Sequence, residues 1–143
     1  MADIRLEFPV AGPVDDVFRA ISTPAGLNAW WTMDAEGTAE IGDRYRLGFG
    51  PGYDWTGVVT KCQPGRTLEW RIENSMPDWE GTLVGFELEE KEGGTRVWFH
   101  HTGWPEANAH YGQSCYCWAM YLRIMKRWIE FGEEVPYSER LNV

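Results

Sequence analysis

The chain has 143 residues and a formal net charge of −9, and its nine Trp, six Tyr and six Phe make an unusually large aromatic share. This length suits one domain with its own core, so we expect a single domain over residues 1–143. Because an acidic surface repels phosphate backbones and anionic lipid headgroups, the charge argues against nucleic acid and membranes as partners.

The N-terminal stretch MADIRLEFPV has neither the basic start nor the apolar run of a signal peptide. No apolar stretch in the chain is long enough to cross a bilayer. The three cysteines are an odd number, and a disulfide framework is not expected from their spacing. Together these features predict a cytoplasmic protein.

The first predicted elements are a strand and two short helices. Residues 4–10 alternate between apolar and polar side chains, which predicts a half-buried strand. Pro13 suits the first turn of a helix whose apolar residues follow at helical spacing up to Ile21. Pro24 closes that helix and can open a second one, which runs through Leu27 to Trp31.

The middle of the chain is divided by turns that contain Gly and Pro, and the segments between them read as strands, several with alternating side chains. These segments are residues 44–49, 54–62, 67–72, 82–90 and 95–103. Short strands joined by tight turns predict an antiparallel meander.

The last predicted element is a long helix, roughly from Glu106 to a C-cap at Gly132. An apolar stripe at steps of three and four is expected to face the sheet, and it consists of Tyr111, Cys115, Trp118, Leu122, Met125 and Ile129. Arg123, Arg127 and Glu130 are expected to point into water. Since only this helix can cover the apolar face of the sheet, the sequence predicts an α+β fold.

The stretch SCYCWAMY places two cysteines one residue apart in this helix. Helical residues two apart point about 200° away from each other, so Cys115 and Cys117 cannot hold one metal or form a disulfide there. We predict Cys115 facing the sheet and Cys117 at the outer flank of the stripe, both as apolar wall. No further ligands lie at zinc-binding spacing, and no motif for a cofactor is present, so neither a metal nor a cofactor is expected.

The order of these elements resembles the helix-grip fold of the START/Bet v 1-like (SRPBCC) superfamily. The stretches that carry the resemblance touch nearly the whole chain: VFRAISTPAGLNAWWT, GPGYDWTGVV with PGRTLEW, GGTRVWFHHTGW and YCWAMYLRIMKRWIEFGE. They are similar to the branch named for activators of the heat-shock protein 90 ATPase. The resemblance implies a curved antiparallel sheet of six to seven strands around the C-terminal helix, with two short helices after the first strand and a cavity between sheet and helix.

Side chains predicted to line this cavity come from the sheet, the short-helix end, the Gly-Pro-Gly turn and the long helix. They are Trp30, Trp31, Phe49, Tyr53, Trp55, Trp70, Phe86, Phe99, His101, Tyr111, Ser114, Cys115, Trp118 and Leu122. The same periodicity is also typical of a filled core, and the sequence leaves this alternative open at each position.

Among the polar groups, His101 shares a strand face with Phe99 and is expected to point inward as a core histidine, a ligand contact or a weak catalytic candidate. His100 and His110 are expected at the surface. Asp78 and Glu80 are read as solvated loop charges, and they flank Trp79, which is read as exposed.

Three functions follow from these observations. The first is the binding of a hydrophobic small molecule, aromatic or acyl, in the cavity. The second is a protein-interaction module of the chaperone-activator type, which the absence of the N-terminal domain of the eukaryotic activators disfavours; a homodimer is a related alternative. The third, least favoured, is a cyclase- or hydratase-type enzyme with His101 and Tyr111 as acid–base groups.

Overall fold

The computed structural model describes residues 1–143 and contains one sheet, three α-helices and a C-terminal 3-10 helix. The elements are β1 (Ala2–Val10), α1 (Val14–Ser22), α2 (Pro24–Trp30), β2 (Asp34–Glu36), β3 (Arg44–Gly48), β4 (Asp54–Gln63), β5 (Thr67–Glu73), β6 (Leu83–Lys91), β7 (Gly94–Trp104), α3 (Ala109–Phe131) and η1 (Tyr137–Asn142). All strand pairs are antiparallel, in the order β1-β7-β6-β5-β4-β3-β2.

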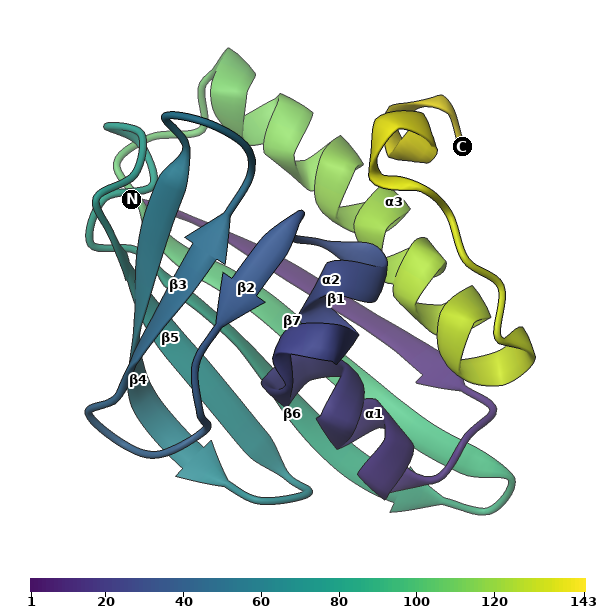
Figure 1. Cartoon of the computed structure of the whole chain (residues 1–143). Coiled ribbons are helices and arrows are strands. Elements are labelled where there is room, and N and C mark those ends of the chain that lie inside the picture. The colour runs from purple at the N-terminus through teal and green to yellow at the C-terminus, as the bar shows by residue number, and fades with distance from the viewer.

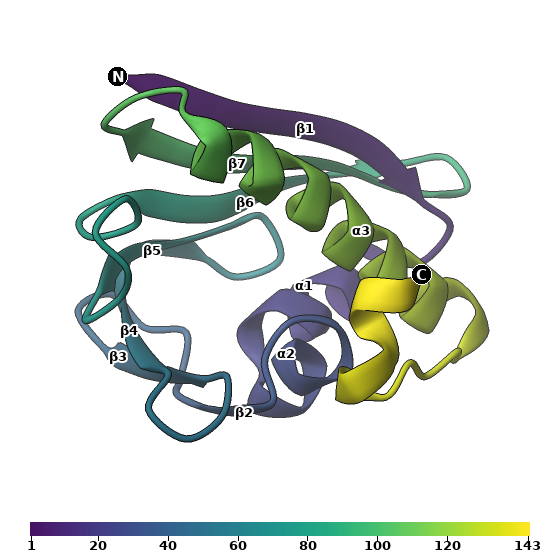
Figure 2. The ribbon, with the colours of Figure 1, turned by 90° about the horizontal axis from the view of Figure 1, so that it is seen from above.

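The sheet curves strongly, and α3 lies along its concave side (Figure 1). Seen from above, β1, β7 and β6 form one arm of the curve, and β4 and β3 form the other, with α1 and α2 beside the opening (Figure 2). This is the helix-grip arrangement that the sequence predicts, and the α+β class is confirmed.

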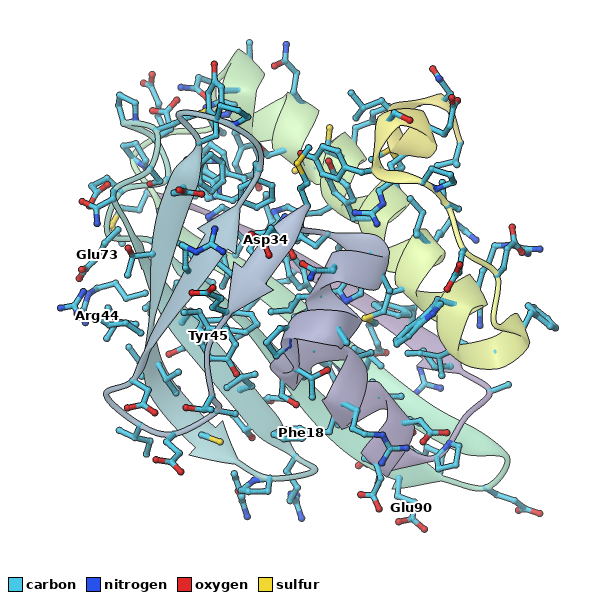
Figure 3. The ribbon with its side chains drawn as sticks, viewed as in Figure 1. Phe18, Asp34, Arg44, Tyr45, Glu73 and Glu90 are labelled. Atoms are coloured by element: carbon cyan, nitrogen blue, oxygen red, sulfur yellow. The ribbon has the colours of Figure 1, made fainter.

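Alternation along the strands explains which face is buried. In β3, Tyr45 is buried and its hydroxyl donates to the Ser22 carbonyl oxygen at 2.6 Å, whereas the neighbouring Arg44 is exposed. Arg44 Nη1 lies 3.1 Å from Glu73 Oε1 on the outer side of the sheet (Figure 3). The period of two therefore separates an apolar inner face from an ion-paired outer face.

The two short helices close one end of the curved sheet. Thr23 is the C-cap of α1 and the N-cap of α2, where its hydroxyl accepts from the Gly26 N–H at 3.0 Å, and Pro24 follows at the first helical position. A Cβ at Gly26 would lie 2.4 Å from the Arg19 carbonyl oxygen, so only glycine lets the two helices pack this closely. The predicted Thr-Pro break is thus confirmed.

The long helix begins later than predicted, because the Asn108 side chain caps it by accepting from the Tyr111 N–H at 2.9 Å. It ends as predicted at Gly132, whose φ of 66° is the left-handed conformation that glycine favours at a helix end. The expectation that Glu130 points into water is wrong. Its side chain is only 9% exposed and accepts from the Ala11 N–H and from Lys126 Nζ.

Two elements were not expected from the sequence. The three-residue strand β2 is too short for an alternation pattern to reveal it. The segment after α3 folds back over the helix and ends in η1, where Arg140 is buried. The Arg140 guanidinium donates to the carbonyl oxygens of Asn28, Thr32 and Val135, which fixes the segment to the end of α2. No helix in the structure combines the length and apolar character needed to span a membrane.

Candidate functional site

A pocket of about 290 Å³ lies between the first half of α3 and the loops at one end of the sheet. Most of its lining is hydrophobic, and it consists of Trp31, Phe49, Trp55, Met76, Trp79, His110, Gln113, Ser114, Cys117, Trp118 and Tyr121. Gln113 is exposed at the rim, so the pocket is open to solvent there.

Five of these side chains form a closed cycle of contacts, which we call the aromatic belt: Trp31, Phe49, Trp55, Trp79 and Trp118. Around the cycle, neighbouring ring centroids lie 5.5, 4.7, 5.0, 5.7 and 5.1 Å apart. Trp79 and Trp118 are stacked at an interplanar angle of 18°. Contacts at these distances make the belt a rigid apolar surface on which flat ligand groups can pack.

The belt draws its members from distant parts of the chain. Trp31 follows α2, Phe49 follows β3 and Trp55 lies in β4, where it pairs with Leu47 of β3. Trp79 comes from the loop between β5 and β6, and Trp118 comes from α3. The curvature of the sheet brings these segments together at the end that α1 and α2 leave uncovered (Figure 2).

His101 lies beneath the belt and connects two of its members. Trp118 Nε1–H donates to His101 Nδ1 at 3.1 Å, so Nδ1 carries no proton. His101 Nε2 therefore carries the proton and donates to Thr82 Oγ1 at 2.8 Å. The Thr82 hydroxyl in turn donates to the Trp79 carbonyl oxygen at 2.6 Å. This chain of hydrogen bonds fixes the tautomer of His101 and orients Trp118 relative to Trp79.

His101 is completely buried, and burial lowers its pKa to about 3. The imidazole is therefore neutral at physiological pH, and both of its nitrogens are occupied by protein groups. It does not line the pocket. Tyr111, the other acid–base candidate, also lies elsewhere, and its hydroxyl donates to the Asp3 carbonyl oxygen at 2.6 Å.

The loop between β5 and β6 is held in place by the two carboxylates that the sequence analysis read as solvated. Asp78 Oδ2 accepts from Asn108 Nδ2 at 3.3 Å and from His110 Nδ1 at 3.0 Å, and these bonds lower the pKa of Asp78. Glu80 accepts from the backbone N–H groups of Asn74 and Ser75. Trp79, between them, is only 7% exposed, so the reading of this residue as exposed is wrong.

The structure brings five of the predicted cavity residues into the pocket: Trp31, Phe49, Trp55, Ser114 and Trp118. Others are buried in the core away from it, namely Trp30, Trp70, Phe86, Phe99, His101 and Leu122. Tyr53 is 59% exposed and forms no part of the lining. Tyr111 and Cys115 are half-buried outside the pocket.

The pocket also contains residues outside the predicted cavity lining, on α3 and in the β5–β6 loop: Met76, Trp79, His110, Gln113, Cys117 and Tyr121. On the helix, the pocket stripe is rotated by one residue from the predicted one, so Cys117 faces the pocket and His110 lines it rather than lying at the surface. The helix carries apolar residues on both flanks, and it packs against α2 and α1 as well as the edge strand β1. The sequence shows the helical spacing of three and four from His110 through Tyr121. It shows the same spacing one residue later, from Tyr111 through Leu122, so the pattern alone does not choose between the two stripes.

The titratable groups in the lining of the pocket include a thiol and a phenol on α3. Burial raises the pKa of the Cys117 thiol and of the Tyr121 hydroxyl, so both stay protonated and neutral at pH 7. No three His, Cys, Asp or Glu side chains lie close enough together to hold a metal ion. The arrangement offers a mostly apolar surface with a few polar groups contributed by α3.

A curved sheet around a long helix, with an apolar pocket between them, defines a helix-grip protein of the SRPBCC type. A family model described as "Activator of Hsp90 ATPase homolog 1-like protein" matches residues 11–130, and the chain belongs to this family. No curated protein matches the sequence.

Solved structures support this assignment. The chain is 30% identical to the Aha1 dimer from Colwellia psychrerythraea, with 93% of this chain and 99% of that one covered and a TM-score of 0.84. Protein MLL2253 from Mesorhizobium loti is 19% identical over 92% of this chain and 99% of that one, with a TM-score of 0.80. CalU16 from Micromonospora echinospora is 24% identical over 96% and 83%, with a TM-score of 0.73. The last two show that the fold is shared.

Proposed function

We propose that this protein binds a hydrophobic small molecule, with a flat aromatic or acyl body, in the pocket between α3 and the open end of the sheet. The observation that carries the proposal is the aromatic belt, which gives a pocket of about 290 Å³ a preformed apolar lining. This volume is near the lower end of the usual range for ligand sites, so the ligand is small. The cytoplasmic location expected from the sequence stays a prediction.

The first test is native mass spectrometry of gently purified protein, followed by denaturing extraction. A mass excess that releases one defined apolar compound supports the proposal and gives the chemical class of the ligand. A second test uses a neutral fluorescent probe of the aromatic-amine type and the variant Cys117→Phe, which fills the pocket from α3. We expect Cys117→Phe to reduce probe affinity at least tenfold.

Ala119→Phe is the matched control, because Ala119 is exposed on the same helix and does not line the pocket. It adds the same ring to α3 and is expected to leave probe affinity unchanged. Equal affinities for the parent protein and Cys117→Phe would contradict the proposal, since the probe would then bind outside the pocket.

The alternative function, a protein-interaction module, draws on a different observation. The relative from Colwellia psychrerythraea is described as a dimer, and this chain exposes Tyr116, Leu141 and Val143 on and beside the outer face of α3. Sedimentation velocity over a range of concentrations tests whether the chain also forms a dimer. An ATPase assay with heat-shock protein 90 tests activation, and the variant Cys117→Phe should leave both results unchanged if a surface rather than the pocket is responsible.

A further inference from the structure

The polar side chains of the pocket that can recognise a ligand's polar end lie on the first two turns of α3. His110, Gln113 and Ser114 all line the pocket, and they are the first three lining residues of this helix. Gln113 is exposed at the rim, whereas Ser114 is 6% exposed and His110 lies between these extremes. The pocket therefore has a polar end that comes from α3 alone. Next to it lies the aromatic belt, to which α3 and four other segments contribute one residue each.

The contact with Asp78 determines which ring nitrogen of His110 faces a protein partner and which one stays free. Asp78 is ionised at neutral pH, because its hydrogen bonds to His110 and Asn108 lower its pKa, and an ionised carboxylate only accepts hydrogen bonds. His110 Nδ1, 3.0 Å from Asp78 Oδ2, must therefore carry the proton. In the neutral imidazole this leaves Nε2 as an acceptor, and no protein group occupies it.

Ser114 supplies a second free group at the same place. It is buried, it lines the pocket, and its hydroxyl makes no hydrogen bond to the protein. Residues four apart on a helix are neighbours on one face, so a single ligand oxygen can reach both His110 and Ser114. The Ser114 hydroxyl reaches the pocket without a protein partner, so a ligand oxygen that enters the pocket can supply that partner.

From this geometry we infer that the pocket selects ligands that end in a neutral hydroxyl group, such as a phenol or enol, on a flat apolar body. The ligand hydroxyl donates to His110 Nε2 and accepts from the Ser114 hydroxyl, while its body packs on the aromatic belt. This inference rests on the proposed function, and it names the chemical class of the ligand.

The same groups discriminate against carboxylates. An anionic oxygen cannot donate to His110 Nε2, and it would be placed near the negative charge of Asp78 in a protein whose net charge is −9. Catalysis by these residues is not part of the inference, because no hydrogen bond joins His110 to Ser114 as the activation of a serine nucleophile requires.

The test compares three probes with one ring system by isothermal titration calorimetry: 2-naphthol, 2-methoxynaphthalene and 2-naphthoate. In the second probe a methyl group replaces the hydroxyl proton of the first, so it can accept but not donate a hydrogen bond. Because one hydrogen bond to a neutral group accounts for roughly a tenfold change in affinity, we expect 2-naphthol to bind about ten times more tightly than 2-methoxynaphthalene. The carboxylate is expected to bind most weakly.

Variants then locate the selectivity. His110→Phe keeps a ring but removes the acceptor. It should lower the affinity for 2-naphthol to that for 2-methoxynaphthalene, whereas the affinity for 2-methoxynaphthalene should hardly change. Ser114→Ala should weaken 2-naphthol a few-fold and leave 2-methoxynaphthalene unaffected. In Asp78→Asn, residue 78 no longer forces the proton onto Nδ1 of His110. The difference in affinity between 2-naphthol and 2-methoxynaphthalene should therefore become smaller.

Equal binding of 2-naphthol and 2-methoxynaphthalene, or a preference that survives His110→Phe, overturns the inference and leaves ligand binding intact. Tighter binding of 2-naphthoate than of 2-naphthol also overturns it. Absence of binding by all three probes, to the parent protein and to the variants alike, overturns the proposed function and the inference together.

Discussion

The two halves of α3 cover two unlike regions of the same sheet. The C-terminal half packs with α1 and α2 on a filled core in which Ile21, Leu27, Trp30 and Met125 are completely buried. The N-terminal half lies over the aromatic belt and leaves a pocket of about 290 Å³. The difference is what closes each end: α1 and α2 join α3 over the first region, whereas α3 alone covers the second.

The boundary between the two regions runs between consecutive residues. Trp30 is completely buried and its Nε1–H donates to the Ala20 carbonyl oxygen at 2.9 Å, whereas Trp31 lines the pocket. Their rings are stacked, with centroids 5.9 Å apart. Two neighbouring tryptophans thus become core or pocket lining according to the elements that cover them.

The largest expected effect comes from removing a side chain from the filled core under α1 and α2. Trp30→Ala removes a fully buried ring and its hydrogen bond, and we expect it to lower the free energy of unfolding by about 3–5 kcal/mol. Trp31→Ala should cost less stability, because one side of Trp31 already borders the pocket, but it should weaken probe binding strongly. Urea denaturation together with probe titration measures both quantities. A larger stability loss for Trp31→Ala would contradict the division into two regions.

Acidification should act on the hydrogen bonds below the belt. The pKa of His101 is about 3 in the folded state and near its ordinary value of 6.5 in the unfolded chain. The unfolded chain therefore binds an extra proton between these values, so stability is lost as the pH falls below 6.5. The loss should reach about 2 kcal/mol at pH 5 relative to pH 8.

The pH effect is isolated with His101→Gln, whose amide can accept from Trp118 and donate to Thr82 without titrating. Urea unfolding of both proteins at pH 8, 6 and 5 measures how much more stability the parent protein loses on acidification than His101→Gln does. If the parent protein and His101→Gln lose the same stability between pH 8 and pH 5, the assignment of a neutral, buried His101 is wrong.

A smaller effect is expected where the C-terminal segment meets the filled region. Arg140→Ala removes hydrogen bonds to the carbonyl oxygens of Asn28, Thr32 and Val135, and it should cost about 1–2 kcal/mol. Hydrogen exchange should then become faster in η1 and not in β5 or β6. Arg123→Ala serves as the control, since Arg123 is exposed on α3 and makes no hydrogen bond. Equal effects of the two substitutions would show that η1 is not fixed by Arg140.

The smallest expected effect concerns the start of α3, next to the pocket. Asn108→Ala removes the N-cap of α3 and a donor to Asp78, and it should lower stability by about 1 kcal/mol. Asn108→Ser is the control, because serine caps helices well but cannot reach Asp78 as the longer asparagine does. Thermal unfolding measures the cost. If Asn108→Ser proves as damaging as Asn108→Ala, the bond to Asp78 rather than the cap accounts for the loss.

Local patterns made much of the fold predictable. Alternation identified β1 and several strands of the meander, the Thr-Pro step identified the break between α1 and α2, and Gly132 identified the end of α3. These features depend on backbone geometry and on residues near in sequence. The strand β2 and the helix η1 escaped prediction, because β2 is only three residues long and η1 is stabilised by Arg140 across more than 100 residues of chain.

The candidate site was only partly predictable. The sequence pointed to Trp31, Phe49, Trp55, Ser114 and Trp118, but it could not separate them from Trp70, Phe86 and Phe99, which have the same periodicity and lie in the core. It also missed Trp79 and His110, since their positions depend on hydrogen bonds between a loop and a helix about 30 residues apart.

The sequence by itself determined the order of the elements, the α+β class and the presence of more aromatic residues than an ordinary core contains. Only the tertiary structure decided which of those aromatic residues line a pocket. The packing of α3 against α2, α1 and β1, and the absence of a second covering helix at one end of the sheet, set that outcome. Both depend on contacts between distant segments, and such contacts leave no periodic signal in any one of the segments that make them.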